Sequence, residues 1–514
     1  MDALSARLAS MLDDRSPRRS PQEPPDTRQS TSISRRLQRD RACLRPCTGA
    51  TSALGMPHPA VSDQRRQIMR KQVILIAAAL LLAPLGAHGA DLVVWWEKGF
   101  YPQEDEAVRE IIAAFEQKTG KQVDLVQPTQ DEMFDQVPTA FESGEPPDFA
   151  LGTRFGSHIS EWAFDDRLLD LTDTVGIFSN LFDPDALAWW MLLNHKTGQR
   201  ALYALPWGRS TNHVHVWNSL LEQAGFTLDD IPREWDAFWS FWCDEVQPAV
   251  RRATGRNDIW GVGLAMSLEA GDTQVQFLQF LAAYDADYVT PDGQLIIDDP
   301  EVRRRLVKAL DDYTATYRKG CTPPGSVSWT GIDNNKAFLA QSVVMTLNES
   351  LSIPNALKHD RPEDYYENSA TMEWPLGPDG QAFPIRGDFY PAVVRKDGRN
   401  VGAAKEFVRF LVAEGWLAHY LDFAGERMLP PMPKLRDAPF WLDPSDPHRM
   451  GAAMQISSRP MQYDYTTVTG DMRYDLTWRE LIWAKAVHRV AAEGISPEQA
   501  VDEAIARIKQ ILAE

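Results

Sequence analysis

Residues 91–126 read DLVVWWEKGFYPQEDEAVREIIAAFEQKTGKQVDLV, and this stretch decides the class of fold. Its first six residues form a short apolar run that is typical of a strand. From Glu104 to Thr119 the apolar residues recur three and four positions apart, which predicts an amphipathic helix. Gly120 ends that helix as a left-handed C′ residue would, and residues 122–126 form a second apolar run. Strand, helix and strand at this spacing predict a βαβ unit, a parallel sheet and an α/β fold.

The same alternation continues along the chain. A helix is expected over residues 131–143, and residues 149–152 form a third apolar run. A second α/β unit begins with the alternating residues 214–217 and the helix that Asn218 starts. In such sheets, ligands bind at the loops that follow the carboxyl ends of the strands. We therefore expect the ligand-binding residues to lie in those loops.

A bacterial export signal is predicted at residues 69–90. Arg70 and Lys71 give it a positive start, residues 73–85 are apolar, and small residues precede Asp91. The apolar run is too short to span a hydrocarbon layer of ~30 Å, so it is a signal peptide and not an anchor. No cysteine follows it that could carry a lipid. We therefore expect an exported protein that resides in the periplasm.

Residues 1–68 precede that signal and have a different composition. They hold twelve Arg and no Lys, with many Ser, Pro and Gln and hardly any apolar periodicity. Such a segment buries too little apolar surface to offset its ordering entropy and is expected to be disordered. Because a signal peptide works at the start of a chain, we expect translation to begin at Met69. The alternative is a basic, disordered arm with a partner of its own.

The exported part of the chain is strongly acidic. The whole chain carries a net charge of −19, of which residues 1–68 contribute +5 and the signal peptide +2, so that residues 91–514 carry −26. A surface of this charge is repelled by nucleic acid and by anionic lipid. We therefore expect no nucleic acid among the partners.

Cys243 and Cys321 are the cysteines of the exported part, because Cys43 and Cys47 lie in the leader. An oxidising compartment permits one disulfide between them. Two separately buried thiols are an equally good reading.

Several further segments resemble those of a known family in both order and spacing. They are ESGEPPDFALG at 142–152, ALPW at 204–207, WNSLLEQAG at 217–225, PREWDAF at 232–238, FLAQSVVM at 338–345 and AAKEFVRFL at 403–411. Together with the opening unit they resemble the extracellular solute-binding proteins of carbohydrate ABC transporters, of the maltose-binding-protein type. Gln341 and Ser342 depart from the glycine-lysine pair that is usual in the family.

The resemblance implies two α/β lobes with a ligand cleft between them and a hinge that the chain crosses three times. Lobe 1 would comprise residues 91–205 and 379–414, and lobe 2 residues 212–372 and 415–514. Such a protein closes around a carbohydrate and delivers it to permease subunits of the inner membrane. We expect it to be a monomer.

Sugar chemistry points to tryptophans that stand in loops beside polar groups. An aromatic ring stacks on the apolar face of a sugar, and neighbouring polar side chains pair with its hydroxyls. Trp207 lies at a proposed hinge crossing and is the best stacking candidate. Of Trp95 and Trp96, one faces the cleft and the other the sheet packing, because neighbours on a strand point to opposite sides; we include Trp96 in the site.

Further candidate residues come from the resemblance and from local chemistry. By resemblance, Glu97 and Lys98 match a pair that binds sugar hydroxyls, and Arg154 matches an arginine of a ligand loop. Thr211 or Asn212 falls where the family has a ligand-binding glutamate, and Trp478 falls near a sugar-stacking tryptophan. The polar or aromatic residues beside proposed strand ends or crossings are Arg209, Asp272, Asn348, Asp388 and Tyr390.

Catalytic and metal-binding motifs are missing from the sequence. It contains no HExxH, no GxSxG and no P-loop, and His213 and His215 lack the partners of a metal site. We expect no catalytic residue, no cofactor and no metal. Two alternatives stay open. An exported glycoside hydrolase needs only two carboxylates in a cleft, and a polyol or a glycerophosphodiester could replace the sugar of a receptor.

Overall fold

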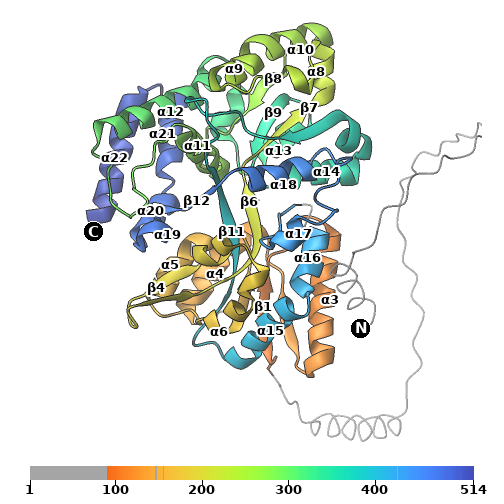
Figure 1. Cartoon of the computed structure of the whole chain (residues 1–514), viewed down its shortest axis with the longest axis vertical. Coiled ribbons are helices and arrows are strands. Elements are labelled where there is room, and N and C mark those ends of the chain that lie inside the picture. Colours follow the sequence, from red (N-terminus) through yellow and green to blue (C-terminus); the bar gives the residue numbers. More distant parts are fainter. Residues whose placement is uncertain (1–88, 145–146, 154, 425–426, 514) are drawn as a thin grey trace, which may run out of the picture. The chain divides into compact units, whose positions relative to one another are not determined.

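The computed structural model describes residues 89–144, 147–153, 155–424 and 427–513 (Figure 1). Residues 87–514 form one compact unit, which contains two large hydrophobic cores and a small third cluster around Leu429 and Trp441. The leader and nearly all of the signal peptide predicted from the sequence lie outside the described residues. The description below concerns the two cores, which we call lobe 1 and lobe 2.

Lobe 1 is built on a sheet with the order β12-β11-β3-β1-β2, in which β6 also pairs with β11. Its strands are β1 (Leu92–Trp96), β2 (Val123–Val126), β3 (Phe149–Leu151), β6 (Leu205–Thr211), β11 (Ile385–Val394) and β12 (Met461–Gln462). β1 runs parallel to β2 and β3, which confirms the predicted βαβ arrangement. β11 runs antiparallel to both β3 and β6, so the sheet is mixed.

The predicted first helix is α3 (Pro102–Thr119), and its apolar stripe explains its place. Ala107, Val108, Ile111 and Phe115 are buried against the sheet, and Gly120 ends the helix with a φ of 71°. The other helical segments of this lobe are α4 (Gln130–Ser143), η1 (Gly156–His158), α5 (Ile159–Phe164), α6 (Thr172–Val175), η2 (Gly176–Leu181), α7 (Pro184–Trp189), α15 (Val401–Ala413), α16 (Trp416–Ala424) and α17 (Pro433–Arg436). A hairpin of β4 (Met191–Asn194) and β5 (Gln199–Leu202) completes it.

Lobe 2 is built on a second sheet with the order β10-β7-β9-β8. Its strands are β7 (His213–Trp217), β8 (Trp260–Gly263), β9 (Val343–Asn348) and β10 (Ser369–Met372). Its earlier helical segments are α8 (Asn218–Ala224), η3 (Leu228–Asp230), α9 (Trp235–Ser240), η4 (Phe241–Val246), α10 (Gln247–Thr254), α11 (Gly271–Ala283), α12 (Pro300–Arg318), η5 (Pro324–Ser328), α13 (Asp333–Leu339), α14 (Ser352–Asp360) and η6 (Asp364–Asn368). The C-terminal helices are α18 (Arg449–Ser458), α19 (Tyr465–Thr469), α20 (Arg473–Arg479), α21 (Ile482–Ala491) and α22 (Pro497–Ala513).

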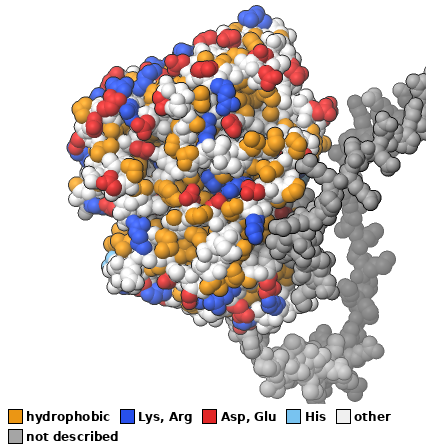
Figure 2. Space-filling view, in the orientation of Figure 1, with side chains coloured by type: hydrophobic (Ala, Val, Ile, Leu, Met, Phe, Trp, Pro, Cys, Tyr) orange, Lys and Arg blue, Asp and Glu red, His pale blue; other side chains and the backbone are white. Residues whose placement is uncertain are grey.

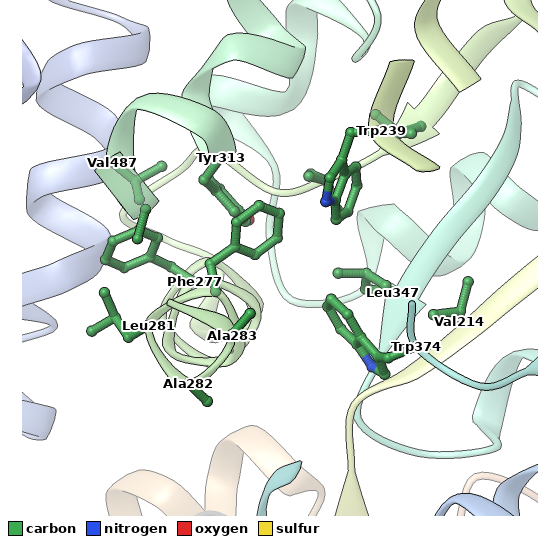
Figure 3. Close-up of a cluster of buried hydrophobic side chains, with 14 of the residues drawn as sticks. Val214, Trp239, Phe277, Leu281, Ala282, Ala283, Tyr313, Leu347, Trp374 and Val487 are labelled. Atoms are coloured by element: carbon green, nitrogen blue, oxygen red, sulfur yellow. The ribbon is translucent and has the colours of Figure 1, made fainter. Parts of the chain in front are cut away.

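The core of lobe 2 surrounds α11, as Figure 3 shows. Phe277 and Leu281 point from this helix toward Val487, and Tyr313 packs beside Phe277 with ring centroids 5.6 Å apart. Trp239 and Trp374 fill the space toward the sheet (Figure 3). Trp235, Trp239 and Trp242, which recur at helical spacing, are all buried in this core.

Cys243 and Cys321 form a disulfide in lobe 2, with Cα atoms 5.1 Å apart and a separation of 78 positions in sequence. The bond joins η4 to the segment after α12. Gly261 lies beside this bond, since a Cβ atom there would be 3.0 Å from Cys321 Sγ. The same atom would be 2.3 Å from the carbonyl oxygen of Trp242, so only glycine fits.

The chain passes between the two cores three times. The first passage lies between β6 and β7, and the second lies within β11, since Ile385 packs in the core of lobe 2 and Phe389 in the core of lobe 1. The third was predicted to lie before residue 415, and the structure corrects this boundary. Leu417, Tyr420 and Leu421 of α16 pack in the core of lobe 1, because the apolar face of this helix lies on α3. Met461 of β12 still packs in that core, so the chain passes to the core of lobe 2 for the last time between Met461 and Tyr465.

Charged side chains of both signs are interspersed over the face that Figure 2 shows. Among the residues that the structure describes, no helix is both long and apolar enough to cross a bilayer.

Candidate functional site

A cavity of about 160 Å³ lies where the two lobes meet the hinge strands. Lobe 1 contributes residues of η1, α5 and α7, and lobe 2 contributes α11, α19 and α20. The hinge strands β6 and β11 supply Ser210 and Asp388. Because the lining comes from both lobes, a molecule bound here would contact both and favour the closed arrangement.

Aromatic side chains form much of the cavity wall: Trp189, Trp190, Tyr288, Tyr465, Tyr474, Trp478 and Trp483. Trp478 is 38% exposed, whereas the other rings are buried. Trp189 is held by Phe389 and Tyr463, whose ring centroids both lie 5.9 Å from its own. Rings that are fixed in this way can stack on an apolar ligand face at little cost in entropy.

Carboxyl groups from three segments face the same cavity. Asp388 comes from β11, Asp464 precedes α19, and Asp475 lies on α20. Burial raises the pKa of Asp388 well above its ordinary value, and the charges of Asp464 and Glu349 raise it further. Burial and the charge of Asp464 raise the pKa of Asp475 in the same sense. The cavity is therefore acidic, and its carboxyl groups repel one another.

Hydrogen bonds fix two of these carboxyl groups. Asp464 accepts from the backbone N–H of Thr467 at 2.5 Å as the N-cap of α19. Asp475 accepts from Thr466 Oγ1 at 2.7 Å, and also from Ser160 Oγ on the opposite lobe. The carboxyl oxygens are thus held in place before any ligand arrives.

Arg386 is the basic side chain that lines this cavity, among the described residues. Its Nη2 donates to Asp287 Oδ1 at 2.8 Å, and the guanidinium lies 5.3 Å from the ring centre of Tyr465. Tyr465 in turn donates its hydroxyl to Asp287 at 2.7 Å. Arg386 is therefore ion-paired with Asp287, a residue that does not itself line the cavity.

The two lobes also touch at the rim of the cavity. Arg479 of α20 forms an ion pair with Glu161 of α5, with Nη2 and Oε2 2.9 Å apart. His158 lies 3.4 Å from the other guanidinium nitrogen, and burial lowers the pKa of this histidine to about 4. A neutral His158 can accept a hydrogen bond from Arg479, so both contacts hold α5 against α20.

Two residues selected from the sequence, Asp388 and Trp478, line the cavity. Thr211 and Asn212 lie at the first hinge passage, next to the lining residue Ser210. Thr211 Oγ1 is 3.2 Å from His213 Nε2, and Asn212 donates to the carbonyl of Val275 at 3.0 Å. Both side chains are buried and fasten the hinge.

The aromatic residues selected at strand ends are packed inside lobe 1 instead of lining this cavity. Trp207 is 1% exposed, and its ring lies 5.6 Å from Tyr390 and 5.8 Å from Tyr420. Trp96 is also buried, with its ring 4.9 Å from that of Tyr420. Side chains of β1 and β6 that point to this face meet α16, which covers them. Trp95, the alternative to Trp96, is half-buried.

The remaining predicted residues are dispersed around the hinge. Glu97 accepts from the backbone N–H and the hydroxyl of Thr153, each at 2.7 Å, whereas Lys98 is exposed. Arg209 lies 3.6 Å from Asp183, and burial lowers its pKa to about 10. Arg154 lies outside the described residues.

Asp272 and Asn348 are buried in lobe 2, where they do not line the cavity. Asn348 donates to the carbonyl of Ser350 at 2.8 Å and accepts from Asn334 at 3.3 Å. Its side chain therefore shapes the turn after β9.

The residues that sequence reasoning missed are Trp189, Trp190, Arg386, Asp464 and Asp475. The doublet Trp189-Trp190 beside the apolar residues 191–193 was a usable signal. Asp464 and Asp475 offered none, because Asp464 reaches the cavity through the pairing of β12 with β11 and Asp475 through the packing of α20. No group of three or more potential metal ligands occurs within the described part of the chain.

Two α/β lobes, a hinge of three passages and a cavity between the lobes define a binding protein that closes around a small molecule. The chain belongs to the bacterial extracellular solute-binding proteins, since the profile of that family matches residues 110–450.

Solved structures of about 20% identity share the fold. One is an ABC transporter solute-binding protein from Thermotoga lettingae bound with α-D-tagatose, with 19% identity and a TM-score of 0.64, over 82% of this chain and 99% of that one. Maltose-bound MalE3 of T. maritima has 20% identity, a TM-score of 0.64 and the same coverage. The GacH receptor of Streptomyces glaucescens has 16% identity and a TM-score of 0.64, over 82% and 98% of the two chains. A comparison with curated proteins found no match.

Proposed function

We propose that this protein is the substrate-binding component of an ABC transporter that imports a carbohydrate. The observation that carries the proposal is the wall of tryptophan and tyrosine rings that alternates with carboxyl and hydroxyl groups at the junction of the lobes. Such a wall offers stacking surfaces for sugar rings and acceptors for their hydroxyls. Solved structures of the same fold include complexes with tagatose and maltose.

The family supports an exported location, and we propose the periplasm. The monomeric protein would carry its ligand to separate permease subunits, each of which would contact one lobe of the closed form. Release would follow when the lobes reopen, because the ligand stabilises closure only while it contacts both of them.

A ligand screen tests this function. The exported protein is purified and its melting temperature is recorded with mono- and oligosaccharides, polyols, glycerophosphodiesters and short peptides. A ligand at 100 times its Kd adds about 2.7 kcal/mol to the free energy of unfolding, which gives a clear shift. We expect shifts from sugars only, and a shift confined to polyols or phosphodiesters would contradict the proposal.

The same samples distinguish a receptor from a glycoside hydrolase. A receptor returns the sugar intact, so chromatography of the recovered ligand should show no cleavage after prolonged incubation. Hydrolysed product in stoichiometric excess over protein would overturn the assignment and support the enzyme.

A further inference from the structure

We propose that the cavity receives a single sugar unit, and that contacts between the lobes at its rim exclude a second one. The imported carbohydrate would then be a monosaccharide. This inference rests on the proposed function and narrows its substrate class. Its basis is the size of the cavity and the way in which the two lobes close around it.

The volume of the cavity limits the size of the ligand. The cavity measures about 160 Å³. A protein cavity of about 150 Å³ accepts a benzene ring, whereas sites for drug-sized ligands measure about 300–1,000 Å³. One six-membered sugar ring with its hydroxyl groups is close to the lower of these sizes, and two linked rings need correspondingly more space. The volume therefore fits one sugar unit.

Beyond one part of the cavity wall, the space between the lobes almost ends. A second void adjoins the cavity there and shares Ser160, Leu192 and Thr466 with it. This void measures about 10 Å³, which is about the space that one water molecule needs. A second sugar unit therefore does not fit behind these three residues unless the lobes move apart.

The first rim contact joins α5 of lobe 1 to α20 of lobe 2. Ser160 donates its hydroxyl to Asp475, and Glu161 pairs with Arg479, with Oε2 and Nη2 2.9 Å apart. Residues four positions apart on a helix share one face, so Asp475 and Arg479 both point toward α5. A sugar unit that passed between these two helices would have to break both contacts.

The second rim contact joins the β4–β5 hairpin of lobe 1 to α19 of lobe 2. Arg200 Nη1 donates to the carbonyl of Met191 at 3.2 Å and to that of Thr467 at 3.4 Å. Thr467 Oγ1 in turn donates to the carbonyl of Trp189 at 3.5 Å. A Cβ atom at Gly470 would be 2.4 Å from Arg200 Nη2, so glycine allows the hairpin to approach this closely. The lobes are thus in contact on this side of the cavity as well.

Sugars of different length test the inference by titration calorimetry on the exported protein. D-Glucose, D-galactose, D-mannose, D-fructose and D-xylose are compared with maltose, cellobiose, lactose, sucrose, mannobiose and xylobiose. We expect a monosaccharide to be the tightest ligand. It should bind at least about tenfold more tightly than any disaccharide that contains it, because the longer sugar gives up a hydrogen bond and an ion pair at the rim.

The other outcomes separate this inference from the proposed function. A disaccharide that binds more tightly than its components would overturn the inference and leave the proposed function standing. Equal affinity would also overturn it, since the second unit would then leave the cavity past the exposed ring of Trp478. Failure of every saccharide to bind would overturn both.

Variants at the rim give a second test. Glu161→Gln and Arg479→Gln each remove the ion pair, and neither residue lines the cavity. Each should weaken binding of the monosaccharide by about two- to fivefold and leave that of its disaccharide unchanged, because a bound disaccharide has already broken the pair. Asp502→Asn removes an ion pair with Arg303 inside lobe 2, at 2.7 Å, and should change neither affinity. If both rim variants fold and the ratio of the two affinities stays the same, the rim does not exclude a second unit and the inference is wrong.

Discussion

The sheet of lobe 2 and the cavity between the lobes both bury ionisable side chains, but these differ in the sign of the charge that burial opposes. At the sheet, Thr371 lies between His215 and His448, with its Oγ1 2.8 Å from an Nδ1 atom of each, and burial lowers the pKa of both histidines. In the cavity wall, burial and neighbouring carboxylates raise the pKa of Asp388. Burial favours the neutral form in both places, so acid acts on the stability of the two regions with opposite sign.

Acid should have the largest effect on the free energy of unfolding, through the two histidines at the sheet of lobe 2. Burial lowers the pKa of His215 and of His448 to about 3, so both are neutral in the folded protein. The unfolded chain binds their protons near pH 6.5, so their stabilising contribution is present above that pH and is lost as the pH falls toward 3. Between pH 6.5 and pH 3, one such histidine lowers the free energy of unfolding by on the order of 5 kcal/mol.

Urea unfolding between pH 7 and pH 4 measures this effect. The cavity acts in the opposite direction, because Asp388 and Asp475 have raised pKa values and their protonation in acid favours the folded state. The variant His448→Gln should flatten the pH dependence. A free energy of unfolding that is constant over this range would show that His215 and His448 are not held neutral.

Replacing Trp207 by alanine should cost about 3–5 kcal/mol of unfolding free energy. The ring is packed against Tyr390 and Tyr420, so its removal leaves a cavity in lobe 1. Trp207→Phe serves as the control and should cost less. A stable Trp207→Ala protein with weakened ligand affinity would mean that the ring contacts ligand, as its position in the sequence predicts.

Replacing Trp478 by alanine should have the converse effect. The ring lines the cavity and is partly exposed, so ligand affinity should fall by about 1–3 kcal/mol. The free energy of unfolding should change by under about 1 kcal/mol, because little packing is lost. Phe423→Ala, which removes an exposed ring of α16, is the matched control for affinity. Calorimetry and urea unfolding on the same samples separate the two effects.

The smallest effect concerns stability without ligand. Asp388→Asn should raise the free energy of unfolding at pH 7, because it removes a charge that burial and neighbouring carboxylates oppose. Differential scanning calorimetry at pH 7 and pH 4 should show the gain only at the higher pH. A loss of stability at pH 7 would mean that the carboxylate is favourably paired in the folded protein.

Local patterns in the sequence were enough to predict the first βαβ unit and much of the fold. The apolar stripe of α3 and the turn at Gly120 depend on residues close together in the chain, so periodicity reveals them. The site depends instead on long-range pairing. β12 is two residues long and brings Asp464 beside Asp388 through its register with β11. Trp207 shows the converse problem, since a tryptophan at a strand end is exposed or covered according to where a distant helix packs.

The disulfide between Cys243 and Cys321 affects when lobe 2 reaches its full stability. Thiols stay reduced in the cytoplasm and pair in oxidising compartments. Closing this loop restricts the unfolded chain, so the bond contributes its stabilisation only after it has formed. Lobe 2 would then remain looser during synthesis and tighten after translocation, when the chain no longer has to pass through the export channel unfolded. Lobe 2 would therefore reach its full stability only after the protein has entered the oxidising compartment.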